Sequence, residues 1–207
     1  MAKCWLPILW LVILCLAVAC GDGGKEPATS TSPPPGTPQP TAVLQGTPRP
    51  TPIIVDGRLE SPAMGYSVHI PEGWNAFPSY LPGPGFSIDA FFAPDLVEGV
   101  QPNIAVTCDQ IPEGTTLTLK EYSDAKLQVA RGVAQVEPDV SSGEVGGQEA
   151  VVARYKREKL EPAVEKTDVF FVTPKCGWTI ALTVPLGHGS DYQGLFEEFL
   201  GSFRLLP

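Results

Sequence analysis

Hydrophobic and polar positions divide the chain into three parts. Residues 4–19 are almost all apolar, residues 21–51 hold few large apolar side chains, and short apolar runs separated by turn residues follow Ile53. A polar, proline-rich segment cannot bury a core. We therefore expect a signal peptide over residues 1–19, a disordered tether over residues 20–52 and one folded domain over residues 53–207.

Several short segments of the domain have the apolar pattern of strands. These segments are residues 66–70, 86–92, 103–108, 150–155, 168–172 and 178–184. The proline-rich stretch between the first two is expected to be a loop, and residues 143–147 read as turn residues because three of them are glycine.

Two capping boxes predict helices in the same domain. Thr118 with Glu121 opens the first helix, and Ser190 with Gln193 opens the second. For the first helix we expect Gly132 at the C-terminal cap and a buried face of Tyr122, Ala125, Val129 and Val133. The second helix has apolar positions at Tyr192, Leu195, Phe196, Phe199 and Leu200. Runs of strands with two isolated helices predict an α+β fold with an antiparallel sheet.

The charge of the domain excludes some partners. The whole chain has a net charge of -9, and 11 of its 14 basic and 21 of its 23 acidic residues follow Thr51, which gives the domain -10. Binding to nucleic acid needs cations that neutralise phosphates, and binding to anionic lipid head groups needs them too. We expect no nucleic-acid partner, and any membrane attachment should come from outside the domain.

The end of the apolar leader resembles a bacterial lipobox. The leader is too short to cross about 30 Å of hydrocarbon, and small residues at positions 17–19 precede Cys20. We expect cleavage after Ala19 and acylation of Cys20 with chains such as palmitate, which would hold the protein on the outer face of a membrane or in the periplasm. Ala17 departs from the pattern, because Leu is preferred there. The alternatives are an ordinary signal peptide, which frees the protein, and an uncleaved anchor.

The sequence of the domain contains few candidates for catalytic or metal-binding residues. The histidines are His69, in a strand pattern, and His188, in a glycine-rich loop with Asp191. An enzyme with dispersed catalytic residues would use the pair His188 and Asp191, although the start of a helix explains that loop as well. The sequence has no nucleophile elbow, no close cluster of His and Cys and no phosphate loop, so we expect no catalytic residues, no metal and no cofactor.

Cys108 and Cys176 are the only cysteines after Cys20. Export makes a disulfide between them feasible, and closing a loop of about 70 residues would stabilise the fold by roughly 4 kcal/mol. One of them ends a strand and the other lies at the tip of a hairpin, so free thiols stay the alternative.

Aromatic residues in the proline-rich stretch suggest a binding loop. Trp74, Phe77 and Tyr80 lie among three prolines between two strands, and long loops often carry function. The alternative is that Trp74 and Phe77 cover the edge of the sheet.

Four segments together resemble the PsbP-like superfamily of exported proteins. They are residues 65–74, 117–122, 146–150 and 196–203, and the resemblance covers residues 59–206. It implies an α/β/α sandwich on a central antiparallel sheet. Photosynthetic members of that superfamily help the oxygen-evolving complex to retain calcium and chloride, and many bacterial members are lipoproteins. The metal-site pattern of the photosynthetic branch does not occur here, so no ligand is carried over.

These observations together predict a non-catalytic accessory or binding protein of the cell envelope, anchored by lipid on Cys20, with a protein partner in the envelope. An envelope hydrolase that uses His188 and Asp191 and a purely structural lipoprotein are the alternatives.

Overall fold

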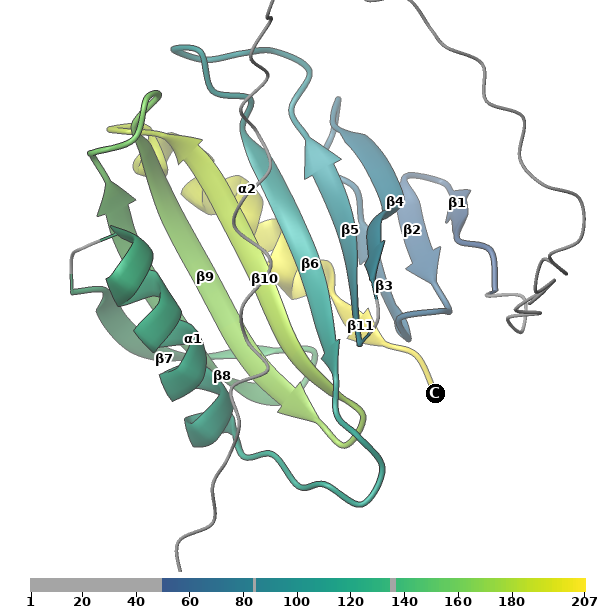
Figure 1. Cartoon of the computed structure of the whole chain (residues 1–207). Helices are drawn as coiled ribbons and strands as arrows, with labels where there is room; N and C mark the ends of the chain where they lie inside the picture. The colour runs from purple at the N-terminus through teal and green to yellow at the C-terminus, as the bar shows by residue number, and fades with distance from the viewer. Residues whose placement is uncertain (1–49, 84, 135–136) are drawn as a thin grey trace, which may run out of the picture. The chain divides into compact units, whose positions relative to one another are not determined.

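A computed structural model describes residues 50–207, with gaps at 84 and 135–136 (Figure 1). The predicted signal peptide, Ala19, Cys20 and nearly all of the predicted tether lie outside the described residues. None of the described helices is long and apolar enough to span a membrane.

The described residues form two antiparallel sheets. The small sheet has the order β1-β2-β3-β11, and the large sheet has the order β4-β5-β6-β10-β9-β8-β7. The strands of the small sheet are β1 (Ile53–Val55), β2 (Arg58–Ser61), β3 (Tyr66–His69) and β11 (Arg204–Leu205). The strands of the large sheet are β4 (Asn75–Gly83), β5 (Phe86–Phe92), β6 (Asn103–Gln110), β7 (Asp139–Val145), β8 (Gln148–Arg157), β9 (Val164–Thr173) and β10 (Cys176–Pro185).

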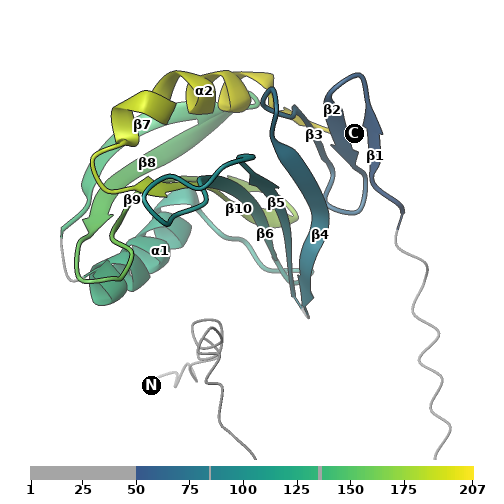
Figure 2. The same cartoon turned by 90° about the horizontal axis from the view of Figure 1, so that it is seen from above.

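The two helices lie on opposite faces of the large sheet (Figures 1 and 2). Helix α1 (Leu119–Ala134) packs on β8 and β9, and helix α2 (Gly189–Ser202) packs on β10 and on β3 of the small sheet. The predicted α+β class and the α/β/α sandwich on a central antiparallel sheet are therefore confirmed.

The main core lies between α2, the small sheet and the large sheet. Trp178 of β10 stacks on Phe171 of β9 with ring centroids 5.6 Å apart, and Phe203 meets both rings edge to face. Burial of each such ring contributes about 1.5–3 kcal/mol. Because Phe203 follows α2 directly, its burial positions the chain for the pairing of β11 with β3.

Two cysteines join neighbouring strands of the same core. Cys108 of β6 and Cys176 of β10 form a disulfide, with Cα atoms 5.6 Å apart and a separation of 68 positions in the sequence. Both side chains are buried. The antiparallel pairing of β6 with β10 brings the two strand ends together, a long-range contact that the sequence alone left open.

Helix α1 presents a different face to the sheet from the one we expected. Tyr122 is buried as predicted, but Val129 and Val133 are 39% and 36% exposed, and Leu127 and Ala130 are buried instead. The helix rests on a second small core formed with Ala153 and Phe170. The predicted face was wrong because the helix carries two apolar stripes, and contacts with the sheet select between them.

The start of α1 follows the sequence prediction and its end does not. Glu121 accepts a hydrogen bond from the backbone N–H of Thr118 (3.0 Å), and the Thr118 hydroxyl accepts one from the N–H of Glu121 (3.2 Å), which confirms the first capping box. Gly132 was predicted as the C-terminal cap, but the helix continues through it to Ala134.

Two segments that we expected to be irregular are strands. The proline-rich stretch forms β4, whose pairing with β5 shifts register between Phe77 and Leu81. An edge strand tolerates proline because its outward N–H groups need no partner in the sheet. Residues 143–145 belong to β7, and only Gly146 and Gly147, both with positive φ, make the turn to β8.

Candidate functional site

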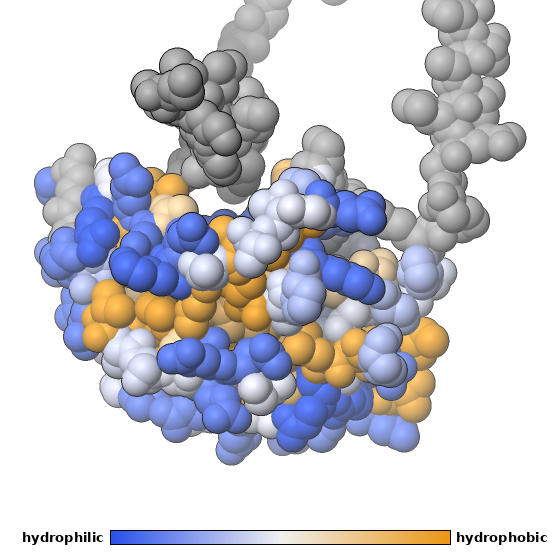
Figure 3. Space-filling view, turned by 90° about the horizontal axis from the view of Figure 1, so that it is seen from below, coloured by the Kyte–Doolittle hydropathy of each residue, from blue (hydrophilic) through white to orange (hydrophobic). Residues whose placement is uncertain are grey.

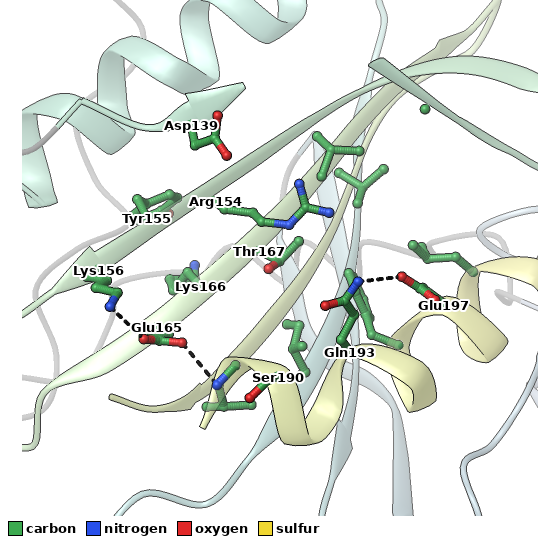
Figure 4. Close-up of a pocket in the computed structure, with 18 of the residues that line it drawn as sticks. Asp139, Arg154, Tyr155, Lys156, Glu165, Lys166, Thr167, Ser190, Gln193 and Glu197 are labelled. Carbon is green, nitrogen blue, oxygen red and sulfur yellow. Dashed lines mark hydrogen bonds and ion pairs between the residues drawn. The ribbon is translucent and has the colours of Figure 1, made fainter. Parts of the chain in front are cut away.

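A groove of about 710 Å³ lies between α2 and strands β7–β10, on the face of the large sheet away from α1 (Figure 4). Its floor is apolar and comes from three strands and the helix. The floor residues are Val152, Val169, Leu182, Val184, Phe196 and Leu200.

Strand alternation positions the groove residues. On β8, Val152, Arg154 and Lys156 point to the groove face, and across the ladder Val152 pairs with Val169 and Arg154 with Thr167. The period of two therefore puts the polar side chains of Arg154 and Lys156 on the same face as the apolar Val152. The alternation is visible in the sequence, but the position of α2 above it is not. For this reason the sequence alone did not predict the groove.

Glu165 of β9 holds the start of α2 at one end of the groove. Its carboxylate accepts hydrogen bonds from the backbone N–H groups of Gly187 (3.1 Å) and Gly189 (3.0 Å), and Lys156 lies 3.2 Å away. Partial burial raises the pKa of the Glu165 carboxyl, but the hydrogen bond from Gly187 and the contacts with Lys156 outweigh it and hold that pKa below its usual value. An anion at the helix N-terminus also interacts favourably with the helix dipole.

The predicted second capping box is therefore wrong. The N-cap of α2 is His188, no side chain of the helix caps it, and Glu165 supplies the acceptors from another strand. Gln193, which we expected to complete the box, donates a 2.8 Å hydrogen bond to Glu197 one turn further along the helix.

Arg154 carries a charge into the groove, as Figure 4 shows. Its hydrogen bond within the described chain goes to the hydroxyl of Ser141, at 3.4 Å. Asp139 stands opposite Arg154 across the β7–β8 ladder, yet the described residues give Arg154 no ion pair. An unpaired guanidinium over an apolar floor can bind a ligand's acceptor groups through several donors at once.

The rim of the groove is acidic. Carboxylates without an ion pair in the described part of the chain come from β7, the β8–β9 connection and α2. They are Asp139, Glu144, Glu158 and Glu197. Within the described residues the lining therefore offers more unpaired negative than positive charge, despite the guanidinium of Arg154.

His188 and Asp191 do come together, outside the residues that line the groove. The His188 Nδ1 atom lies 2.9 Å from Asp191 Oδ2, and its Nε2 atom lies 3.5 Å from Glu98. Hydrogen bonding to Asp191, and then to Glu98, raises the pKa of His188. Each ring nitrogen of His188 therefore contacts a carboxylate. The pair of His188 and Asp191 has a structural role at the start of α2. Within the described ranges no three His, Cys, Asp or Glu residues cluster as a metal site would need.

The aromatic residues of the predicted binding loop point to different places. Trp74 packs against the main core and meets Tyr192 of α2 edge to face, with ring centroids 6.3 Å apart. Phe77 is 47% exposed and contacts Phe92, with ring centroids 5.6 Å apart. Phe92 follows the core residue Phe91, so strand alternation places it on the other face of the sheet. The side chain of Tyr80 lies outside the described residues.

Comparison with known proteins identifies the fold. No family model matches the sequence, and no curated protein matches it. The solution structure of the cyanobacterial PsbP protein CyanoP from Synechocystis superimposes with a TM-score of 0.50 at 17% identity, covering 72% of this chain and 91% of CyanoP. The crystal structure of LpqN from Mycobacterium tuberculosis superimposes with a TM-score of 0.50 at 13% identity, covering 69% of this chain and 83% of LpqN. The chain therefore has the PsbP-like fold that its four sequence segments suggested.

Proposed function

We propose that this chain is an exported, lipid-anchored accessory protein of the cell envelope, and that it binds a partner in the groove between α2 and β7–β10 without catalysing a reaction. The observation that carries the proposal is the guanidinium of Arg154, which lies over an apolar floor and has no ion pair within the described residues. Ligand sites combine a largely apolar concave lining with a few polar groups that fix orientation.

The sequence supports the location. An apolar leader, the lipobox ending at Cys20 and a long proline-rich segment precede the domain. A structural neighbour points the same way, because LpqN is described as involved in cell envelope biogenesis. Lipid on Cys20 would hold the protein at the membrane, and the tether would let the domain reach partners away from the surface.

The geometry favours binding over catalysis. The pair that a hydrolase would use, His188 and Asp191, lies outside the groove lining and holds the start of α2 to the loop that carries Glu98. The groove lining offers carboxylates, hydroxyls, one amide, two lysine ammonium groups and one guanidinium, which can orient a bound molecule.

The proposal is tested by site-specific cross-linking in the native host. A photo-reactive residue replaces Gln193, which lines the groove, and in a matched chain it replaces Glu198, an exposed position of α2 outside the lining. We expect a discrete adduct from position 193 and none from position 198, and we expect Arg154→Glu to abolish it. The same adducts from both positions, or adducts indifferent to Arg154→Glu, would overturn the proposal and favour a purely structural lipoprotein.

A further inference from the structure

Strand β7 is the last strand of the large sheet next to the groove, and its outer edge is unpaired within the described part of the chain. The sheet order ends at β7, and no described residue pairs with its outer side. Six of its seven residues are exposed or half-buried, and only Val145 is buried. Such an edge presents a row of backbone donors and acceptors that another strand can pair with.

The β7–β8 turn decides which backbone groups face outward. Gly146 and Gly147 form a two-residue turn with positive φ, so its flanking residues Val145 and Gln148 bond to each other. In an antiparallel ladder the bonded pairs alternate with pairs whose N–H and C=O groups face away. The outward-facing groups therefore belong to Val140, Ser142 and Glu144.

The other edge of the sheet is closed to pairing. Strand β4 contains Pro78 and Pro82, and its ladder with β5 is interrupted between Phe77 and Leu81. Prolines and bulges are the usual protection of an edge strand. Strand β7 has no proline, and its register with β8 is regular along its full length. The two edges therefore differ in what prevents strand addition: β4 has prolines and an interrupted ladder, and β7 has neither.

The groove indicates the chemistry of a strand that would pair there. Val145 and Val152 give an apolar surface beside β7, so side chains of an added strand that face the groove should be apolar. The rim carboxylates Asp139, Glu144 and Glu158 have no ion pair within the described residues, and complementary charge on the partner would be positive.

From this geometry we infer that β7 is a docking edge, which accepts an extended, basic segment of a partner protein as an additional strand of the large sheet. The inference rests on the proposed function, because it names the kind of partner bound at the groove. The added strand bonds to the outward groups of Val140, Ser142 and Glu144. Alternate apolar side chains lie over the groove, and basic side chains meet the acidic rim. Main-chain bonds supply affinity and the alternate side chains supply specificity, as in other cases of strand addition.

The test selects peptides and then removes one outward N–H. The full chain in detergent micelles is used to select from a phage-displayed library of random dodecapeptides, and the enriched peptides are synthesised. We expect enrichment of Lys and Arg with alternate apolar residues, and protection of the amides of Val140, Ser142 and Glu144 from hydrogen exchange. Ser142→Pro should weaken binding by about tenfold or more, because it removes a donor and adds a ring at the edge. Ser142→Ala keeps the N–H and should bind like the wild type.

A second variant leaves the backbone unchanged. Asp139→Lys combined with Glu144→Lys should weaken binding of the same peptides by about tenfold or more, and should reduce the salt dependence of binding, since long-range attraction between charges is screened by salt. If no peptide is enriched, or the enriched peptides are not basic, or both variants bind like the wild type, the docking edge is refuted.

The two proposals fail in different ways. Loss of the adduct at position 193 with Arg154→Glu, together with normal cross-linking of Ser142→Pro, would keep the groove as the site and refute strand addition. An adduct at position 193 that persists in Arg154→Glu but disappears with Ser142→Pro would refute the role given to Arg154 and keep the docking edge.

Discussion

The phenol of Tyr66 donates a 2.8 Å hydrogen bond to Oδ2 of Asp89, and both residues are 0% exposed. Tyr66 belongs to β3 of the small sheet and Asp89 to β5 of the large sheet. The other oxygen of Asp89 accepts a 2.6 Å hydrogen bond from the N–H of Ser79, where β4 departs from regular pairing. One buried carboxylate therefore links the two sheets to the irregular part of the edge strand.

Removing the phenolic hydroxyl of Tyr66 should destabilise the domain. Tyr66→Phe leaves one oxygen of the buried Asp89 carboxylate without its donor, which costs about 1–3 kcal/mol. The measurement is the free energy of unfolding in urea. Tyr192→Phe is the matched control, because the Tyr192 hydroxyl has no hydrogen bond within the described chain, and its effect should stay within about 0.5 kcal/mol. Equal stability of Tyr66→Phe and the wild type would contradict the role given to this bond.

Stability should fall in alkaline solution. Burial, and then the charge of a neighbouring aspartate, raises the pKa of Tyr66 and of Tyr122 above the ordinary value. The unfolded chain ionises these phenols near pH 10 while the folded chain does not, so stability is intact below about pH 10 and is lost as pH rises above it. Each tyrosine should contribute a slope of about 1.4 kcal/mol per pH unit. Urea unfolding at several pH values measures it, and Tyr122→Phe should reduce the slope.

Gly177 should not tolerate a side chain. A Cβ atom there would lie 2.5 Å from the ring of Tyr122, which covers this position of β10 from α1. Gly177→Ala should therefore displace the helix and cost about 1–3 kcal/mol. In Gly194→Ala the new methyl group meets nothing within 4 Å, and the helix should gain about 0.5–1 kcal/mol. Thermal unfolding of the two variants compares these effects, and a stable Gly177→Ala would show that Tyr122 does not pack as described.

Loss of the disulfide should be costly. Its loop of 68 residues predicts a stabilisation of about 4 kcal/mol from restriction of the unfolded chain. The double variant Cys108→Ala with Cys176→Ala should lose about that amount in urea unfolding. Reductant should destabilise the wild type in the same way and leave the double variant unchanged. A peptide map without reductant that lacks the cross-linked fragment would contradict the pairing.

The anchor is tested at Cys20. Cys20→Ser removes the thiol on which acylation is expected, so it should prevent incorporation of labelled palmitate. It should also release the protein from membranes, because stable anchoring needs two or more acyl chains. Cys15→Ser is the matched control and should stay labelled and membrane-bound. A Cys20→Ser protein that remains on the membrane, with no label in the wild type, would refute lipidation at this position.

Local patterns explain which elements the sequence predicted. Strands such as β5 and β10 carry strong apolar runs, and the capping box at Thr118 has both partners within one turn of helix. Strand β7 was missed because its sequence is polar, and β4 was missed because Pro78 and Pro82 are typical of loops. Both are edge strands, where packing against neighbours imposes the fewest requirements on sequence.

The candidate site depended on contacts that no local pattern contains. Glu165 caps a helix that begins more than twenty residues later, and Arg154 is part of a groove only because α2 crosses above β8 to β10. The same holds for α1. The helix has two apolar stripes, and only one of them packs against Ala153 and Phe170. Pairing of the cysteines likewise followed from the neighbouring positions of β6 and β10.

The prolines of β4 limit how far the large sheet can be extended by added strands. A sheet with two open edges can add further copies of itself without limit. With Pro78 and Pro82 closing one end, a contact through β7 of this domain can join two sheets but leaves no end for a third. The large sheet can therefore end a row of paired strands but cannot extend it, so pairing through β7 does not propagate along this sheet.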